Sequence, residues 1–332
     1  MTEVKLVYSF RKLPFVRQTP KSSGIWGDCR FYLNDETTNC DWFVAYESIY
    51  QQEKINCSSE NTIFITAEPP SVRKYNPDFL RQFNYVISSH SDIEHPNLLL
   101  TQQALPWRVG LKHQNGQTLR NGNDYDELAA RGEIRKDKLM SVITSDKTIT
   151  EGHKERIAFV NLLKDEFGDE VDIFGRGINT FADKWDVMAP YKYHISLENS
   201  QYNDYWTEKL SDVFLCRTYP IYYGCPNITD YFSNKSMSVI DIHKPAEAIR
   251  TIRKIIQDNT FEKSGNHLKQ AQDLVLNKYN FFAMISDFTK NHSKTNGPEN
   301  EIIEIMPESS FKKKKEGAIT RALGFLKGRH KG

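Results

Sequence analysis

The chain has few cysteines and none at the spacing of a metal-binding or redox pair. Its 332 residues include five cysteines, Cys29, Cys40, Cys57, Cys216 and Cys225, and no C-x-x-C motif. An odd number without close pairs argues against a disulfide framework and against a structural zinc site. We therefore expect these thiols to be reduced.

The sequence also lacks an excess of charge of either sign. Lys and Arg together number 44 against 43 Asp and Glu, which gives a formal net charge of +1. Proteins that bind nucleic acid through their overall electrostatic field need a clear basic excess. We therefore expect no nucleic-acid partner, and any basic binding surface must be local.

No long apolar run occurs near the beginning of the sequence, and no internal repeat is present. Residues 4–10 are interrupted by Lys5 and followed by Arg11 and Lys12. This segment is too short for the core of a signal peptide or for a membrane span. We expect a cytoplasmic protein.

Short apolar runs alternate with segments of helical periodicity along the chain. Strands are predicted at residues 5–10, 41–45, 62–66, 85–88, 98–101, 139–144, 171–174, 193–197, 220–223 and 238–242. Helices are predicted at residues 153–167, 205–216, 246–256 and 263–288. Such alternation indicates an α/β fold with parallel sheets covered by helices on both faces.

A polar segment divides the predicted elements into two groups. Residues 115–137 are rich in Gly, Asn and charge, as domain junctions commonly are. A chain of this length can bury two separate cores. We predict two Rossmann-like domains facing each other across a cleft, at residues 1–137 and 138–292, followed by a polar and basic tail at residues 293–332.

The most informative stretch is residues 191–226, where a predicted strand is followed by a turn and a helix. Apolar residues recur there at helical spacing, at Trp206, Leu210, Val213 and Phe214. Asp204 can cap this helix, and Lys209 adds a positive charge in its first turn. A strand that leads to a helix N-terminus with a nearby lysine suits phosphate binding at the carboxyl end of a parallel sheet. An ordinary surface turn explains the same spacing equally well.

Three motifs in this part of the chain carry a family resemblance. ENSQ at residues 198–201, YWTEK at 205–209 and YPIYYGCPN at 219–227 resemble the donor-binding block of the α-1,3-fucosyltransferases, glycosyltransferase family ten. The resemblance covers roughly residues 172–242, is patchy before them and is nearly absent at the end of the chain. It implies a GT-B architecture, with the sugar nucleotide on the C-terminal domain and the acceptor on the N-terminal one.

The resemblance also implies an activity and a set of donor-binding residues. The activity is an inverting transfer of L-fucose from GDP-fucose to a hydroxyl of an acceptor glycan. The implied donor-binding residues are Arg156, Glu198, Asn199, Tyr205, Glu208 and Lys209, and the glycine turn after residues 171–174 adds Gly175 as a further candidate. Arg156 and Lys209 would neutralise charge on the departing GDP, and Glu208 would bind the ribose hydroxyls. Glu198, Asn199 and Tyr205 would orient the sugar and the nucleotide.

Some of these residues also have simpler interpretations. An arginine such as Arg156, near the start of a predicted helix, is commonly just solvated. Gly175 lies in the turn of VDIFGRG, where glycine permits close backbone approach to a nucleotide, but glycines after strands are common in α/β proteins.

Residues 62–70, TIFITAEPP, place Glu68 at the end of a predicted strand. Pro69 and Pro70 prevent the strand from continuing and stiffen the loop. Such a glutamate is more often a plain strand-end residue than a catalyst. The resembled family has its general base in a matching block, which implies that Glu68 takes the proton from the acceptor hydroxyl.

The sequence predicts no obligatory metal or other cofactor. Asp124-Tyr125-Asp126 has the D-x-D pattern by which other glycosyltransferases hold a divalent ion, but it lies in the polar junction rather than at a strand end. We therefore interpret it as a chance match. Glu198 and Glu208 have nine residues between them, a poor fit to the paired glutamates of retaining enzymes, which favours inversion.

The end of the chain is basic. Residues 312–315 are four lysines, and Ile319, Ala322, Leu323 and Leu326 fall on one helical face. This pattern indicates a basic amphipathic helix that could lie on an anionic membrane surface, such as the inner face of a bacterial cell membrane. A surface polysaccharide or lipopolysaccharide acceptor would suit such a tail. Gly317, Gly324 and Gly328 weaken helix formation, so a disordered solubilising tail is the alternative.

Two other functions fit the same motifs. The chain could transfer another nucleotide sugar, since the residues named above address nucleotide and phosphate more than the sugar hydroxyls. It could also be a non-catalytic carbohydrate-binding relative. The joint presence of Glu68, Arg156, Glu208 and Lys209 argues against the second, because a binder needs neither a base nor two phosphate-facing cations.

Overall fold

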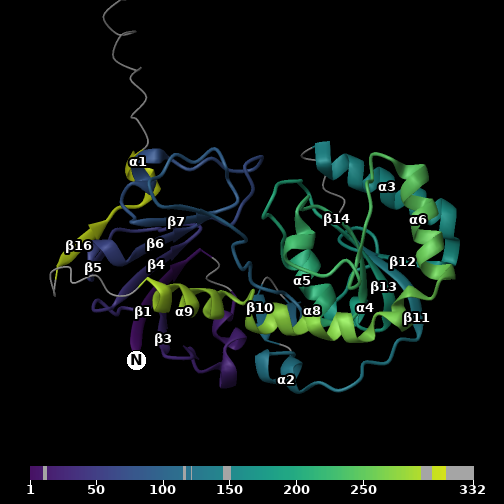
Figure 1. Cartoon of the computed structure of the whole chain (residues 1–332), viewed down its shortest axis with the longest axis horizontal. Helices are drawn as coiled ribbons and strands as arrows, with labels where there is room; N and C mark the ends of the chain where they lie inside the picture. The colour runs from purple at the N-terminus through teal and green to yellow at the C-terminus, as the bar shows by residue number, and fades with distance from the viewer. Residues whose placement is uncertain (10–12, 115–116, 121, 145–150, 293–300, 312–332) are drawn as a thin grey trace, which may run out of the picture.

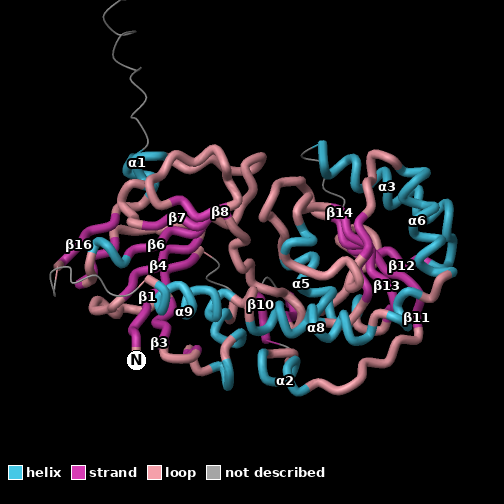
Figure 2. Tube along the Cα trace, in the orientation of Figure 1, coloured by secondary structure: helices cyan, strands magenta, loops and turns pink. Residues whose placement is uncertain are grey.

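The computed structural model of the chain has two α/β domains that lie side by side (Figure 1). It describes residues 1–9, 13–114, 117–120, 122–144, 151–292 and 301–311. Each domain is built on a sheet of mostly parallel strands, and Figure 2 shows the two sheets separated by loops and helices.

The N-terminal sheet has the strand order β2-β3-β1-β4-β6-β7-β8. Its strands are β1 (Thr2–Tyr8), β2 (Ile25–Trp26), β3 (Cys29–Leu33), β4 (Trp42–Tyr46), β6 (Thr62–Ile65), β7 (Tyr85–Ser88) and β8 (Leu98–Leu100). All neighbouring pairs run parallel except β2 and β3. Parallel sheets are normally covered on both faces, which explains why the central strands β4 and β6 are buried at every position.

Alternate side chains of this sheet enter two separate cores. One core contains Val44 of β4 and is covered by helix α9 (Phe281–Asn291), which inserts its aromatic side chains. The other contains Phe43 and is covered by α1 (Pro77–Leu80) and by the antiparallel pair of β5 (Glu53–Asn56) with β16 (Ile302–Ile305). The sheet therefore depends on segments from the end of the chain on both faces.

The C-terminal sheet has the order β12-β11-β13-β14-β15, and all its strands are parallel. They are β11 (Lys138–Ile143), β12 (Val171–Phe174), β13 (Tyr191–Leu197), β14 (Tyr219–Tyr223) and β15 (Ser238–Val239). Helices α3 (Glu151–Phe167) and α6 (Pro245–Gln257) lie on one side, with α4 (Lys184–Met188), α5 (Glu208–Leu215) and α8 (Gly265–Asn277) on the other (Figure 1). From β11 the chain adds β12 on one side and then crosses to the other side to add β13, β14 and β15. In open α/β sheets, such a topological switch point forms the ligand crevice.

Smaller elements join the two sheets. They include the hairpin of β9 (Leu111–Gln114) and β10 (Gln117–Arg120) and the short helix α2 (Tyr125–Ala130). The short helix α7 (Thr260–Lys263) lies between α6 and α8 within the C-terminal domain. The 3-10 helices are η1 (Phe15–Gln18), η2 (Pro20–Ser22), η3 (Ser59–Asn61), η4 (Gly168–Glu170), η5 (Ile228–Asp230) and η6 (Glu308–Phe311). Arg17 is buried among the joining segments and donates hydrogen bonds to the carbonyls of Asn123 and Trp107, at 3.0 and 3.1 Å.

All ten predicted strands are present, but the prediction of one helix over residues 263–288 is wrong. The structure has α8 and α9 there, separated at Asn280. The side chain of Asn280 accepts a hydrogen bond from the Phe282 N–H at 2.9 Å, which caps α9, and it donates to the Gln18 carbonyl at 2.8 Å. The hydrogen bond to Gln18 ties Asn280 to the N-terminal domain, so the chain changes direction at this residue.

The break moves part of the chain to a different domain from the one predicted. Residues 281–291 fall inside the predicted second domain of residues 138–292, yet their side chains pack in the core of the first. Residues 302–305 fall in the predicted tail, yet they form a strand beside β5. The lysine run and the predicted amphipathic helix at residues 312–332 lie outside the described residues. No helix in the described part of the chain is long and apolar enough to cross a membrane.

Candidate functional site

A pocket of about 300 Å³ lies at the carboxyl end of the C-terminal sheet. Thr144 follows β11 in its wall, Gly175 follows β12, and Leu197 ends β13. These three strand ends meet at the switch point of the sheet, where ligands of open α/β folds bind. Five of the predicted donor-binding residues line this pocket: Arg156, Gly175, Asn199, Glu208 and Lys209.

Gly175 is required by the backbone at this point. Its φ is +147°, and a Cβ atom built there would lie 1.5 Å from the carbonyl oxygen of Thr144. Any other residue would displace one strand end from the other. The close approach seen at Gly175 is to the backbone of Thr144, and the predicted approach to a nucleotide stays a prediction.

Helix α5 begins at Glu208 and is capped by Thr207 rather than by Asp204, so the predicted cap is wrong. The Thr207 hydroxyl accepts the Lys209 N–H at 3.2 Å. Asp204 lies earlier in the turn with a φ of +63°, and its carboxylate accepts hydrogen bonds from Asn227 at 2.9 Å and from Tyr231 at 2.5 Å. These contacts hold Asp204 in the turn and away from the helix.

The carboxylate of Glu198 is buried directly behind the start of α5. It accepts hydrogen bonds from the Thr207 N–H at 2.9 Å and from the Thr207 hydroxyl at 2.8 Å, and it pairs with Lys209 Nζ at 3.1 Å. The Glu198 side chain has no exposed surface, whereas that of Lys209 is 28% exposed. Direct contact of Glu198 with a donor, as predicted, does not fit this burial. Its contacts fit a role in positioning Lys209.

Glu208 lies at the first position of α5 and faces two cations. Lys184 Nζ is 3.5 Å from its carboxylate, and Lys209 is the next residue. Burial alone would raise the pKa of Glu208, but the charges of Lys209, Lys184 and Arg108 outweigh it and hold the pKa far below its ordinary range. Glu208 is therefore ionised and can only accept hydrogen bonds.

Lys184 is a pocket residue that the sequence did not reveal. It pairs at 2.8 Å with Asp212, whose side chain has no exposed surface and also accepts the N–H groups of Arg108 and Val109 at 2.7 and 3.1 Å. Lys184 lies in a helix of five residues and has no motif around it. A pattern based on local spacing could not have found it.

Arg156 is buried at the opposite wall of the pocket, where its guanidinium bonds to the side-chain oxygen of Asn199. Val160 and Leu163 of α3 are buried in the core, whereas Arg156 of the same helix lines the pocket. Asn199 thus directs the guanidinium, which suits bidentate binding of a phosphate.

His194 forms part of the pocket floor. Its Nδ1 lies 2.8 Å from the Ser141 hydroxyl on the neighbouring strand. Burial, together with the charge of Lys184, lowers the pKa of His194 to about 3, so the ring is neutral near pH 7. Tyr205 is buried, and burial is the main cause that raises its pKa. The nearby negative charges of Glu198, Glu68 and Glu208 raise this pKa further.

Glu68 belongs to the other domain and lies close enough to Lys209 and Glu208 for their charges to act on it. It follows β6 on an exposed loop, and the adjacent Ser71 hydroxyl lies 2.8 Å from that of Ser200 in the C-terminal domain. Partial desolvation raises the pKa of Glu68, and the charge of Glu47 raises it further while that of Lys209 lowers it. A carboxylate that is sensitive to Lys209 lies near the α5 end of the pocket, so the structure brings Glu68 toward the predicted donor residues.

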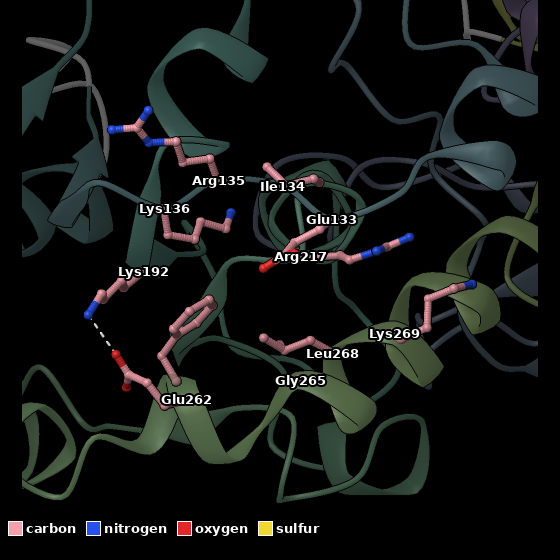
Figure 3. Close-up of a pocket in the computed structure, with 11 residues that line it drawn as sticks. Glu133, Ile134, Arg135, Lys136, Lys192, Arg217, Glu262, Gly265, Leu268 and Lys269 are labelled. Carbon is pink, nitrogen blue, oxygen red and sulfur yellow. Dashed lines mark hydrogen bonds and ion pairs between the residues drawn. The ribbon is translucent and has the colours of Figure 1, made fainter.

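A larger cavity of about 730 Å³ lies at the other end of the C-terminal sheet (Figure 3). Its cations are engaged by the protein: Lys192 pairs with Glu262 at 2.6 Å, and Lys136 donates to the carbonyls of Ala189 and Cys216 at 2.6 and 2.8 Å. Since the cavity adjoins the amino ends of the strands, whereas Thr144, Gly175 and Leu197 lie at their carboxyl ends, it does not join the site described above.

The D-x-D motif has a local structural role. Asp124 caps α2 through a reciprocal capping box with Glu127, and Asp126 accepts the Lys21 N–H at 2.5 Å. Within the described ranges no group of three or more His, Cys, Asp or Glu side chains is placed to hold a metal ion. The expectation that no metal or cofactor is obligatory stays a prediction.

Comparison with known proteins identifies the domain that carries the pocket. Residues 134–282 match the model of the C-terminal region of glycosyltransferase family 10, the fucosyltransferases. The C-terminal domain belongs to glycosyltransferase family 10. The predicted family and the predicted α/β fold of GT-B type, with two facing parallel-sheet domains, are thereby confirmed.

Individual relatives of this family 10 domain match a short part of the chain. A GDP-fucose protein O-fucosyltransferase 3 from Homo sapiens is 36% identical over 75 residues, which cover 22% of this chain and 16% of the human protein. An α-(1,3)-fucosyltransferase from Helicobacter pylori is 37% identical over 71 residues, or 21% and 15% of the two chains. The matched segments span about a sixth of the length of these relatives.

Solved structures resemble the chain over most of its length. A crystal structure of an α1,3-fucosyltransferase with GDP-fucose aligns with a TM-score of 0.49 at 18% identity, over 90% of this chain and 92% of the other. A complex of MnaA from S. aureus with UDP aligns with a TM-score of 0.44 at 8% identity, over 91% and 100%.

Proposed function

We propose that this protein is a glycosyltransferase that transfers L-fucose from GDP-fucose to a hydroxyl of an acceptor glycan. The observation that carries the proposal is the charged pocket at the switch point of a family 10 domain. Among the described residues that line it, four are cations, namely Arg156, Arg176, Lys184 and Lys209, and one is the carboxylate Glu208. This balance suits a diphosphate with a neighbouring hydroxyl-rich group.

The cations would bind and stabilise the leaving group. A lysine ammonium has three N–H donors, and for Lys209 the partners described above, Glu198 and Thr207, take two of them. The third can reach a phosphate oxygen. Arg156, oriented by Asn199, would bind the diphosphate from the other wall. Positive groups fixed where negative charge develops lower the barrier to departure of GDP.

Glu68 would act as the general base in a single displacement. Its carboxylate takes the proton of the acceptor hydroxyl while the oxygen attacks the anomeric carbon, and the bond from that carbon to GDP breaks on the opposite face. The proposal therefore includes inversion at the anomeric carbon. An α-1,3 linkage, a bacterial surface polysaccharide or lipopolysaccharide acceptor and a cytoplasmic or membrane-peripheral location stay predictions.

Hydrolysis of a panel of sugar nucleotides by the full chain tests this function, with water as the acceptor. Release of GDP from GDP-fucose, faster than nucleotide release from GDP-mannose, UDP-glucose or UDP-N-acetylglucosamine, is the expected result. Faster turnover of another donor would establish the alternative of a different transferase. Donor binding without release from any of them would instead support a non-catalytic carbohydrate-binding protein.

A further inference from the structure

A buried glutamate lies beneath the loop that carries Glu68. Glu47 follows β4 at the carboxyl edge of the N-terminal sheet and is 6% exposed, and its N–H donates to the Ile65 carbonyl at 2.8 Å. Its φ of +68° is uncommon for a residue with a side chain and costs about 1 kcal/mol or more. The surrounding contacts must therefore hold Glu47 in this conformation.

The Glu47 carboxylate binds the backbone of the loop on which Glu68 lies. One oxygen accepts the Ala67 N–H at 2.6 Å, the Glu68 N–H at 3.3 Å and the Tyr75 hydroxyl at 2.6 Å. The other oxygen pairs with Arg73, which also donates to the Glu47 carbonyl at 3.0 Å. Hydrogen bonds to an ionised acceptor are stronger than neutral ones, so this anion fixes the backbone at Glu68 itself.

The network extends to the end of the described chain. The guanidinium of Arg73 also pairs with Glu308, whose second oxygen accepts the Asn76 N–H at 2.7 Å. The Arg73 guanidinium carbon lies 4.5 Å from the centre of the Tyr75 ring. Glu308 follows β16, which is bound to the N-terminal domain through β5. Residues 301–311 thus support the Glu68 loop from outside.

We infer that Glu47 is a positioning residue that sets the direction and the charge environment of Glu68, and that Glu308 holds Arg73 so that Glu47 can do so. The inference rests on the proposed role of Glu68 as the base. A network that served only to stabilise the fold would not need to end on the two N–H groups at Ala67 and Glu68.

The charged groups around Glu68 determine whether its pKa rises or falls when the charge of Glu47 is removed. Glu47 and Arg73 face it from its own domain, with the His90 ring 2.7 Å from its carbonyl, and Glu208 and Lys209 face it from the other domain. Among these, the negative charge of Glu47 favours the protonated form of Glu68. Removal of that charge leaves Arg73 without one of its partners and favours the ionised form.

Three isosteric variants of the full chain test the inference: Glu47→Gln, Glu308→Gln and the control Glu304→Gln. Glu304 lies on the same C-terminal segment, but it pairs at the surface with Lys54 at 3.5 Å and is 52% exposed. Two quantities are measured: the pKa of Glu68, by NMR titration of glutamate labelled at the side-chain carboxyl carbon and assigned with Glu68→Gln, and kcat for GDP-fucose hydrolysis.

In Glu47→Gln we expect the pKa of Glu68 to fall and kcat to decrease by about tenfold to a hundredfold, because a misdirected base loses its alignment. Glu308→Gln should lower the pKa of Glu68 and kcat as well, but to a smaller extent than Glu47→Gln. The affinity for GDP should stay within about twofold of the wild-type value in both variants. Glu304→Gln should match the wild type. If Glu47→Gln does not fold, Glu308→Gln carries the test.

Folded variants that keep both the wild-type pKa of Glu68 and the wild-type kcat would overturn the inference. A loss of kcat with an unchanged pKa and weakened GDP binding would do so as well, because it would indicate a general structural defect. A wild-type protein that releases no nucleotide from any donor contradicts the proposed function instead, and the NMR titration then decides the inference alone.

Discussion

The Glu198 carboxylate lies 3.1 Å from Lys209 Nζ, and the two residues lie at opposite ends of the loop that joins β13 to α5. Glu198 follows β13, and Lys209 is the second residue of α5. The ion pair therefore connects a strand end to the start of a helix, and it fixes the ammonium at the edge of the pocket. Burial of the carboxylate makes this connection energetically important.

Replacement of Glu198 by glutamine should destabilise the protein and weaken GDP binding. The change removes the buried anion that faces Lys209 and leaves this partly exposed ammonium with Glu208 as a nearby anion, so we expect a loss of about 1–3 kcal/mol of unfolding free energy. Urea unfolding measures this loss, and titration calorimetry measures the affinity for GDP. The control is Glu262→Gln, which breaks an exposed pair with Lys192 and should cost about 0.2–1 kcal/mol. Equal stability of the two variants would show that Glu198 does not anchor Lys209.

The pH dependence of turnover should report the environment of Glu68. A general base must be ionised, so kcat/KM should fall as the pH decreases through the pKa of Glu68. Because that pKa is raised above the ordinary 4.5, the fall should begin at a higher pH than for a free glutamate. Initial rates of GDP release between pH 4 and pH 9, about the range in which the fold is expected to persist, measure it.

Glu68→Gln should no longer show the fall of kcat/KM at low pH, and its activity should be lower than that of the wild type by about a hundredfold to ten-thousandfold. Its affinity for GDP should be retained. Glu60→Gln, at an exposed glutamate of the same domain, is the matched control. A pH profile of Glu68→Gln identical to that of the wild type would assign the base to another residue.

Lys184 should contribute to both stability and binding, and a pair of variants can separate the two. Lys184→Met leaves Asp212 buried without its ion-pair partner, so unfolding free energy should fall by about 3–5 kcal/mol. Lys184→Met combined with Asp212→Asn removes the uncompensated charge and keeps an acceptor for the Arg108 N–H. The double variant should regain stability without regaining GDP affinity. Recovery of both would limit Lys184 to a structural role.

Gly175→Ala should disrupt the junction of β11 and β12. The added methyl group would overlap the Thr144 carbonyl oxygen, and the φ of +147° is open mainly to glycine. We expect a loss of more than about 3 kcal/mol, or failure to fold, measured by thermal unfolding. Gly132→Ala, where a Cβ atom meets nothing within 4 Å, should change stability by no more than about 1 kcal/mol. A stable Gly175→Ala protein would contradict the described contact.

The strands could be predicted because parallel strands that are buried on both faces are short and continuously apolar. Residues 85–88 and 171–174 were bounded correctly on this basis. The pocket residues of α5 followed from their motif. The cap of α5 was predicted wrongly because Asp204 and Thr207 are both good capping residues, and Asn227, distant in sequence, decides between them.

Other features depend on contacts that no local pattern contains. Lys184 and Glu47 acquire their importance from partners such as Asp212 and Arg73, which lie far from them along the chain. The break between α8 and α9 depends on Asn280 and its bond to Gln18. The hydrophobic periodicity continues through that break, so it predicts one helix where the fold requires two.

The return of α9 to the first domain has a consequence for biosynthesis. During synthesis, the sheet of residues 2–100 leaves the ribosome without the aromatic side chains of Phe281, Phe282 and Phe288 that cover one of its faces. That face remains open until the whole C-terminal sheet has been translated. The C-terminal domain can complete its own core first, while the nascent N-terminal sheet keeps an uncovered apolar face of the kind that promotes aggregation.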